Sequence, residues 1–174
     1  MKVLAFAASN SRSSINKALV TYASSLLEHA QIDLIDLNDY EMPIYSSDRE
    51  NDSGIPQLAH DFYNKISAAD AVIISFAEHN GSYTAAYKNL FDWTSRIDTK
   101  VYQDKPTVLL ATSPGPGGAG SVLVAAKGSA PYFGMKVKAD LSVAKFFDEF
   151  DMEKGKLKNA TTNAQLLTAI SQLK

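Results

Sequence analysis

The stretch that decides the fold reads Ser75-Phe-Ala-Glu-His-Asn-Gly-Ser-Tyr-Thr-Ala-Ala-Tyr-Lys-Asn-Leu-Phe-Asp-Trp93. It follows an apolar, strand-like run from Ala71 and leads into a segment with helically spaced apolar residues: Ala86, Leu90, Trp93 and Ile97. Between the two lies a polar loop, residues 78–82, with a glycine near its end. Because a glycine lets the backbone approach a flat molecule, the stretch predicts a strand, a ligand-binding loop and a helix in that order.

The same order of elements repeats along the whole chain. The pattern of apolar residues predicts strands at 2–8, 31–37, 71–77, 106–112 and 135–143. It predicts helices at 14–29, 55–68, 84–97, 119–133 and 160–173. Such alternation favours a parallel sheet with helices on both faces. At 174 residues the chain has the size of one domain, so we expect a single domain over residues 1–174.

The pattern of apolar and polar residues differs between the strands, and this difference predicts their order in the sheet. The first, third and fourth are continuously apolar, as strands buried on both faces must be. Residues 135–143 alternate strictly between apolar and polar, and residues 31–34 do so in part, which indicates edge strands with one wetter face. This predicts the order 2-1-3-4-5 of the flavodoxin-like fold, an α/β, doubly wound, five-stranded parallel sheet. Ligands bind such sheets beyond the carboxyl ends of the strands, where three polar loops fall.

The first of these loops runs from Ser9 to Asn16. Its side chains are hydroxyls, an amide and one guanidinium, and it leads into a predicted helix: Ser9, Ser11, Arg12, Ser13, Ser14, Ile15 and Asn16. A helix start attracts anions, and an arginine adds charge-assisted hydrogen bonds. Since the loop has no glycine, a terminal phosphate fits better than the pyrophosphate of a dinucleotide. Simple N-capping is the alternative, but a cap needs only one such residue.

The second and third loops are suited to a planar group. The second offers backbone donors and acceptors from Glu78 to Ser82, and its alternative interpretation is an ordinary turn at Asn80-Gly81. The third, Ser113-Pro-Gly-Pro-Gly-Gly118, is rich enough in glycine for a ring to lie against the backbone, unless it is simply a flexible surface loop. Together the three loops predict a mononucleotide site.

Two kinds of side chain near the second loop are expected to have no catalytic role. His79 is a lone histidine in a loop, which is usually solvated or packed. Tyr83 and Tyr87 are more typical of core or interface aromatics than of residues stacked on a ligand.

Composition narrows the class of protein further. The net charge of −2 gives no general attraction to nucleic acid or to anionic membranes. No apolar run approaches the roughly 20 residues that a membrane-spanning helix needs. The chain has no cysteine and only three, widely separated histidines, so we expect neither disulfides nor a metal site. We therefore expect a soluble, cytoplasmic protein.

The loop motifs resemble those of the NADPH-dependent FMN reductase family, which includes quinone, azo-dye and chromate reductases of the flavodoxin-like fold. The family's first loop, roughly Gly-Ser-x-Arg-x-x-Ser-x-Asn, is matched at Ser9, Ser14 and Asn16, with Arg12 one place after the family arginine. The long second motif is matched at Glu78, Asn80, Gly81, Ser82, Lys88, Asn89, Asp92 and Trp93. The third is matched loosely at Ser113, Gly117 and Gly118, and the segment Pro43-Ile-Tyr45 also looks like the family. The resemblance extends to about residue 145.

The resemblance implies a flavoenzyme in which FMN takes hydride from NADPH or NADH and reduces a small acceptor. The acceptor would be a quinone, an azo compound, a metal oxyanion or free flavin. The phosphate would bind at Ser9, Ser11, Arg12, Ser14, Ile15 and Asn16. The ring would lie between Glu78, His79, Asn80, Gly81 and Ser82 on one side and Ser113, Pro114, Gly115, Gly117 and Gly118 on the other. No side chain is needed as an acid or base, so none is assigned as catalytic. The family also implies a homodimer or homotetramer.

Two other functions are compatible with parts of the pattern. The first is a flavodoxin-like electron carrier without nicotinamide turnover, which the small net charge of −2 disfavours because such carriers tend to be strongly acidic. The second is a dinucleotide-binding domain with Asp36 as the ribose-binding acid, which the missing Gly-x-Gly-x-x-Gly motif disfavours.

Overall fold

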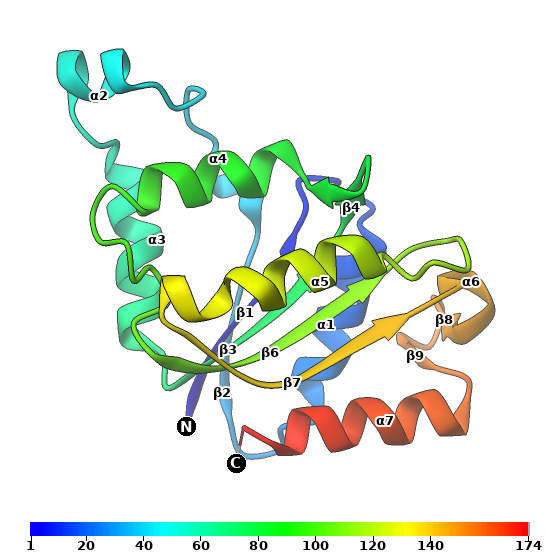
Figure 1. The fold of residues 1–174 in the computed structure, drawn as a ribbon. Coiled ribbons are helices and arrows are strands. Elements are labelled where there is room, and N and C mark those ends of the chain that lie inside the picture. Colours follow the sequence, from blue (N-terminus) through cyan, green and yellow to red (C-terminus); the bar gives the residue numbers. More distant parts are fainter. Residues whose placement is uncertain (174) are drawn as a thin grey trace.

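A computed structural model describes residues 1–173 of the chain. Its centre is a five-stranded parallel sheet (Figure 1). The strands, from one edge to the other, are β2 (Gln31–Ile35), β1 (Lys2–Ala8), β3 (Ala71–Phe76), β6 (Lys105–Thr112) and β7 (Met135–Val143). In chain order these five strands have the predicted arrangement 2-1-3-4-5, and the two alternating strands lie at the edges as expected.

Helices cover both faces of the sheet, and each face has its own apolar core. On one face lie α3 (Gln57–Ala68), α4 (Ala85–Thr94) and α5 (Gly120–Ser129); on the other lie α1 (Ile15–Ser25) and α7 (Ala160–Ser171) (Figure 1). Along β1, Leu4 and Phe6 belong to the first core, whereas Val3 and Ala5 belong to the second. Because alternate residues face opposite layers, a central strand must be apolar at every position.

The edge strand β7 shows the opposite pattern. Its ends, Met135 and Val143, are buried, and between them the exposed residues Lys136, Lys138 and Asp140 alternate with half-buried apolar ones. Met135 and Val137 pack against the first core, whereas Ala139, Leu141 and Val143 pack against the second, and the pairing register shifts between these two stretches. Each stretch of this edge strand thus has one packed side and one wet side, which explains the strict alternation in the sequence.

Several short elements were not predicted. They are η1 (Leu37–Tyr40), α2 (Ser47–Ser53), the hairpin β4 (Glu78–His79) with β5 (Ser82–Tyr83), α6 (Phe146–Glu149), and the pair β8 (Phe150–Asp151) and β9 (Lys156–Leu157), while the helix predicted at 119–133 is divided into α5 and η2 (Ala130–Phe133). Such elements are too short for an apolar period to develop, and α2 has no buried residue at all. The predicted first helix also ends earlier than expected, at Ser25. Among residues 1–173, no helix is both long and apolar enough to cross a membrane.

Candidate functional site

The three predicted loops meet at one end of the sheet. They follow β1, β3 and β6, which are neighbours and run parallel, so all three loops lie beyond the carboxyl ends of adjacent strands. Thr84, which caps α4 after the second loop, donates its hydroxyl hydrogen bond to the carbonyl oxygen of Ala8, at 3.0 Å, next to the first loop. The sheet order and this contact bring together segments that are far apart in the sequence.

Asn16 fastens the first loop to the two other strands. Its side chain is buried; its Oδ1 accepts from Ser75 Oγ at 2.7 Å and from the Thr112 N–H at 3.1 Å. Its Nδ2 donates to the Thr112 carbonyl oxygen at 3.2 Å. These bonds use both acceptor positions of the amide and leave one N–H for a ligand. The Asn16 side chain, predicted as a phosphate ligand, therefore holds the loop in place and has one N–H to spare.

The rest of the first loop presents donors around the start of α1. Ser14 caps the helix, with Oγ accepting from the Lys17 N–H at 3.2 Å, and Ser9 Oγ accepts from the Ser11 N–H at 3.2 Å. N-capping, the alternative interpretation, is thus part of the loop's role. The N–H groups of the first helical turn, at Ile15 and Asn16, have no carbonyl partner within the helix. Ser11, Arg12 and Ser13 are exposed beside them, so a phosphate here would meet amides, hydroxyls and a guanidinium.

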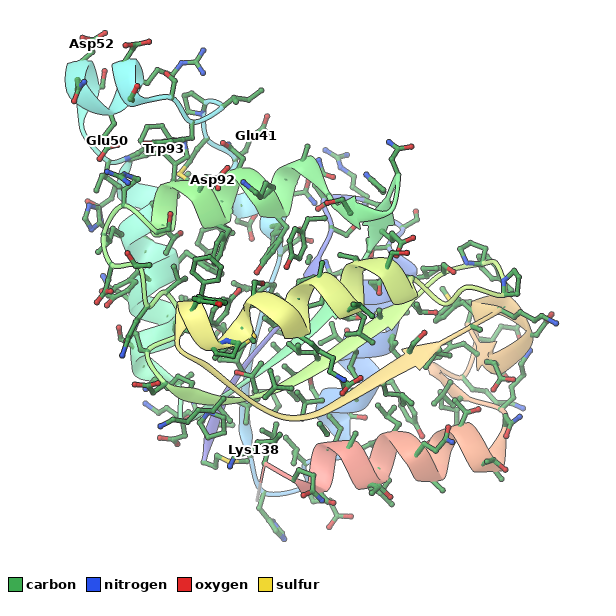
Figure 2. All side chains as sticks on the ribbon, in the orientation of Figure 1. Glu41, Glu50, Asp52, Asp92, Trp93 and Lys138 are labelled. Atoms are coloured by element: carbon green, nitrogen blue, oxygen red, sulfur yellow. The ribbon has the colours of Figure 1, made fainter. Side chains whose placement is uncertain are left out.

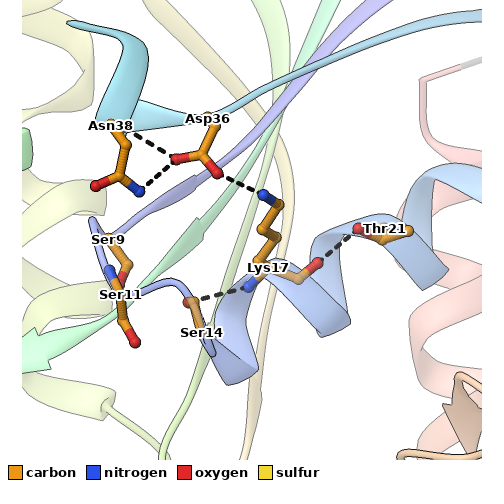
Figure 3. A network of polar contacts seen from close by, with 7 residues as sticks. All are labelled: Ser9, Ser11, Ser14, Lys17, Thr21, Asp36 and Asn38. Atoms are coloured by element: carbon orange, nitrogen blue, oxygen red, sulfur yellow. Dashed lines mark hydrogen bonds and ion pairs between the residues drawn. The ribbon is translucent and has the colours of Figure 1, made fainter.

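A small polar network stands next to this loop (Figure 3). Lys17 Nζ forms an ion pair with Asp36, and Asp36 Oδ1 accepts from the Asn38 N–H at 2.9 Å at the start of η1. The hydrogen bond from Lys17 and that from the Asn38 amide lower the pKa of the Asp36 carboxyl. Its carboxylate is thus bonded within the protein, and the structure gives no separate support to Asp36 as a ribose-binding acid.

The second loop is the tip of the hairpin β4–β5. Asn80 and Gly81 have φ values of 53° and 77°, as a two-residue turn of the primed type requires. The Glu78 carboxylate accepts from the Val122 N–H at 2.9 Å, so it ties the hairpin to the first turn of α5. Around Gly81, an added Cβ would meet no atom within 4 Å. With His79, Asn80 and Ser82 exposed, the tip offers open backbone to a ligand.

The third loop is anchored to the segment before α6. The carbonyl oxygen of Ser113 accepts from the Phe146 N–H at 3.0 Å, and that of Gly115 accepts from the Lys145 N–H at 2.9 Å. Because these bonds hold the loop to a neighbouring segment, they disfavour its alternative interpretation as a flexible surface loop. Gly115 and Gly117 have open space where a Cβ would lie, and Pro114 is exposed.

At position 118 a glycine is required by close packing against neighbouring residues. A Cβ there would lie 2.3 Å from Ser142 Oγ and 3.1 Å from the Ala144 nitrogen. This glycine allows the loop to pack against the end of β7, whereas the glycines at 115 and 117 have open space around them.

Sequence reasoning missed the residues that hold the loops in place. Ser75 and Thr112 bind Asn16, and Lys145 and Phe146 bind the third loop. A hydroxyl within the otherwise apolar run of β3 was the one available signal for Ser75. Tyr83 and Tyr87, expected in a core or an interface, pack in the core between α4 and the sheet.

Two residues of the long second motif hold another segment. The Asn89 amide donates to the Met42 carbonyl oxygen at 3.0 Å and accepts from the Tyr45 N–H at 2.9 Å. Trp93 Nε1 donates to the Pro43 carbonyl oxygen at 2.7 Å. Figure 2 shows Trp93 between α4 and the segment that carries Glu41 and Glu50. Asn89 and Trp93 thus hold residues 42–45 in place beside the site.

Comparison with known proteins agrees with this geometry. The family model described as NADPH-dependent FMN reductase matches residues 1–148. An NADPH:quinone oxidoreductase of Arabidopsis thaliana is 31% identical over 122 residues, which are 68% of this chain and 61% of that protein. A 2-hydroxy-1,4-benzoquinone reductase of a Burkholderia species is 32% identical over 117 residues, 66% of this chain and 62% of that protein. The matches thus span under two thirds of the length of these relatives.

Solved structures show the same fold. A flavoenzyme described as an NAD(P)H:(acceptor) oxidoreductase, from Paracoccus denitrificans, superposes with a TM-score of 0.80 over 99% of this chain and 94% of its own, at 23% identity. A structure described as a putative quinone reductase from Klebsiella pneumoniae gives a TM-score of 0.70 over 99% of this chain and 85% of its own, at 18% identity.

Proposed function

This chain belongs to the NADPH-dependent FMN reductase family, and from that membership we propose that it is an FMN-dependent NAD(P)H oxidoreductase. Its acceptor would be a small molecule: a quinone, an azo compound, a metal oxyanion or free flavin. The observation that carries the proposal is the meeting of an anion-binding helix start with two glycine-containing loops at the carboxyl edge of one sheet. The similar proteins from Arabidopsis and Burkholderia, which are named as quinone reductases, favour a quinone.

The residues present fit FMN. The helix-start amides of Ile15 and Asn16, the hydroxyls of the first loop and the guanidinium of Arg12 form a donor set for a terminal phosphate. The open backbone at Gly81 and at Gly115–Gly117 leaves space where a ring could lie against peptide groups.

When bound, FMN would supply the hydride and electron chemistry, and the protein would orient it. Backbone donors of the hairpin tip would stabilise negative charge on the ring, which is a preorganised electrostatic role. No side chain has to transfer a proton in this scheme. Nicotinamide and acceptor would use the same open side in turn, which predicts ping-pong kinetics.

The test is an anaerobic mixing experiment. FMN-loaded protein is mixed with NADPH and separately with NADH while the absorption band of oxidised flavin is followed. Rapid bleaching supports the proposal, and the faster donor gives the preference. Bound flavin that does not bleach would favour the electron carrier instead, and failure to bind FMN would refute the assignment of the three loops.

We also propose that the protein is a cytoplasmic homodimer or homotetramer. The absence of cysteine and the intracellular electron donor support the location. For assembly, α5 is apolar nearly all round, as buried helices are, yet one stripe of it is uncovered. We call this stripe, together with Tyr132 of the adjoining η2, the α5 outer face: Ser121, Val124, Ala125, Gly128 and Tyr132. Val124 and Tyr132 are 72% and 76% exposed, so a partner has apolar surface to bury there.

A further inference from the structure

A cavity lies beside the hairpin strand β5, between α4, α5 and η2. Its volume is about 250 Å³, and none of its lining residues belongs to the predicted flavin site. Its wall is mainly aromatic: Phe76, Tyr83, Tyr87, Phe91, Tyr102 and Phe133. A dry, apolar cavity of about 150 Å³ can hold benzene. This cavity therefore has room for an aromatic molecule of one or two rings.

One hydrogen-bond donor in that wall is unused. Tyr87 and Tyr102 are 4% and 0% exposed, and their hydroxyl oxygens are 2.8 Å apart. Each phenol carries one proton, and the bond between them uses one of the two. Within residues 1–173, no other protein acceptor bonds either hydroxyl. Burial raises the pKa of both phenols, so both remain protonated and one O–H of the pair is not used by the described part of the protein.

The charges at the rim cancel. Lys88 Nζ pairs with both carboxylate oxygens of Asp92, at 2.7 and 2.8 Å. The other polar lining groups are hydroxyls, such as that of Ser129, 3.4 Å from the Tyr83 hydroxyl. A charged ligand would lose its hydration here without gaining an unpaired opposite charge, so the lining favours a neutral one.

We propose that this cavity binds a neutral aromatic ketone of one or two rings, whose carbonyl oxygen accepts the spare phenol proton of the Tyr87–Tyr102 pair. The rings of the ligand would pack edge-to-face and offset against the aromatic wall. The thioether of Met135, which also lines the cavity, adds a sulfur–aromatic contact. This site uses none of the residues assigned to the flavin, although its Tyr83 directly follows Ser82 of the second loop.

The test compares two ligands of the same shape. The probe is 1-tetralone, a two-ring aromatic ketone, and the comparator is tetralin, which lacks the carbonyl. Both are titrated by calorimetry into flavin-free and FMN-loaded protein. Tetralone should bind about three- to tenfold more tightly than tetralin, as expected for one neutral hydrogen bond. Equal affinity for the two, or no binding of either, would overturn the proposal.

A matched double variant tests the donor itself. Tyr87→Phe combined with Tyr102→Phe removes both hydroxyls and keeps the ring wall; a single variant would leave one free O–H. Because both partners of the bond are replaced by apolar groups of similar shape, the fold should tolerate the change. The variant should bind tetralin as before and lose the preference for tetralone. A preference that survives would show that the carbonyl binds elsewhere.

A third measurement places the ligand. Nuclear Overhauser effects between the aromatic protons of tetralone and the methyl group of Met135 are expected in the wild type. They should vanish in Ala126→Leu, because Ala126 is a buried residue of the cavity wall and the larger side chain occupies the space. Tetralone that instead perturbs the flavin absorption without contacting Met135 would be bound at the flavin, which would refute the cavity site.

Discussion

At the scale of single residues, Asn16 joins parts of the structure that are nearly a hundred positions apart. Replacing it with Ala would leave Ser75 Oγ, the Thr112 N–H and the Thr112 carbonyl without their bonds to its amide in a buried setting. We expect Asn16→Ala to lower the free energy of unfolding by about 2–4 kcal/mol, measured by urea denaturation. The exposed neighbour change Ser13→Ala serves as control and should stay within about 0.5 kcal/mol. Equal stability of the two variants would contradict the role given to Asn16.

Gly81 allows a test that separates backbone strain from ligand contact. A valine at φ +77° is strained, and at Gly81 it would also project into the open space assigned to the flavin ring. Gly54, at the end of α2, has φ +72° and equally open surroundings. Gly81→Val should therefore lose about 1–2 kcal/mol of stability. Gly54→Val should lose about 1–3 kcal/mol, because the ψ of −173° at Gly54 lies in a region that essentially only glycine adopts.

Flavin binding should distinguish these two variants. Gly81→Val should weaken FMN by at least about tenfold, or 1.4 kcal/mol, whereas Gly54→Val should bind it like the wild type. Fluorescence titration of FMN measures both. If the two variants bind FMN equally well, the hairpin tip does not touch the ring.

Asp36 gives a prediction of pH dependence. Its pKa in the folded protein is lowered by Lys17 and by the Asn38 amide, so its stabilising effect is present above the unfolded pKa of about 3.9 and is lost as pH falls through the folded value. Asp36→Asn should therefore lower stability at pH 7, and its difference from wild type should shrink as the pH falls below about 4. Because the Lys17 side chain is 41% exposed, the effect should be below about 1 kcal/mol. Unfolding free energies of both proteins from pH 7 to 3 check this; a difference that stays constant over that range would contradict it.

At the scale of elements, α4 holds the segment 42–45 through Asn89 and Trp93. Asn89→Ala removes the bonds to Met42, Pro43 and Tyr45, so the segment should open more often. We expect amide hydrogen exchange of residues 42–46 to accelerate several-fold while the sheet keeps its protection. Lys88→Ala on the same helix breaks only an exposed ion pair with Asp92 and should leave exchange in the segment unchanged. Unchanged exchange in Asn89→Ala would show that Trp93 suffices.

The elements also show what the sequence could and could not predict. All five strands of the main sheet were predicted. The three central strands could be found because a strand buried on both faces has to be apolar at every position, and the two edge strands because apolar and polar residues alternate in them. The hairpin β4–β5 was seen only as a loop, since two-residue strands have no period. The proposed site residues were assigned from their loops and stay a prediction. The partners of Asn16 and Glu78 were not predicted, because Thr112 and Val122 lie far away in the sequence.

At the scale of the whole molecule, one sheet separates two cores, and the loops gather where the strands end. Strand order was predictable because burial on one or both faces leaves a different pattern in each strand. The structure of one chain does not by itself show whether another chain covers one of its helices. The α5 outer face is the candidate surface for such a contact, because α5 has the composition of a buried helix while Val124 and Tyr132 are exposed.

If this face is the contact between subunits, a charge placed at its centre should split the assembly. Val124→Glu buries a carboxylate without a partner in the interface but leaves it in water in the monomer, so dissociation is favoured and folding is not affected. Sedimentation velocity should show the wild type as a dimer or tetramer and Val124→Glu as a monomer with unchanged circular dichroism. Leu167→Glu on α7, also an exposed apolar position, is the matched control and should keep the wild-type mass. Assembly that survives Val124→Glu but fails in Leu167→Glu would move the interface to the opposite face of the sheet, away from α5.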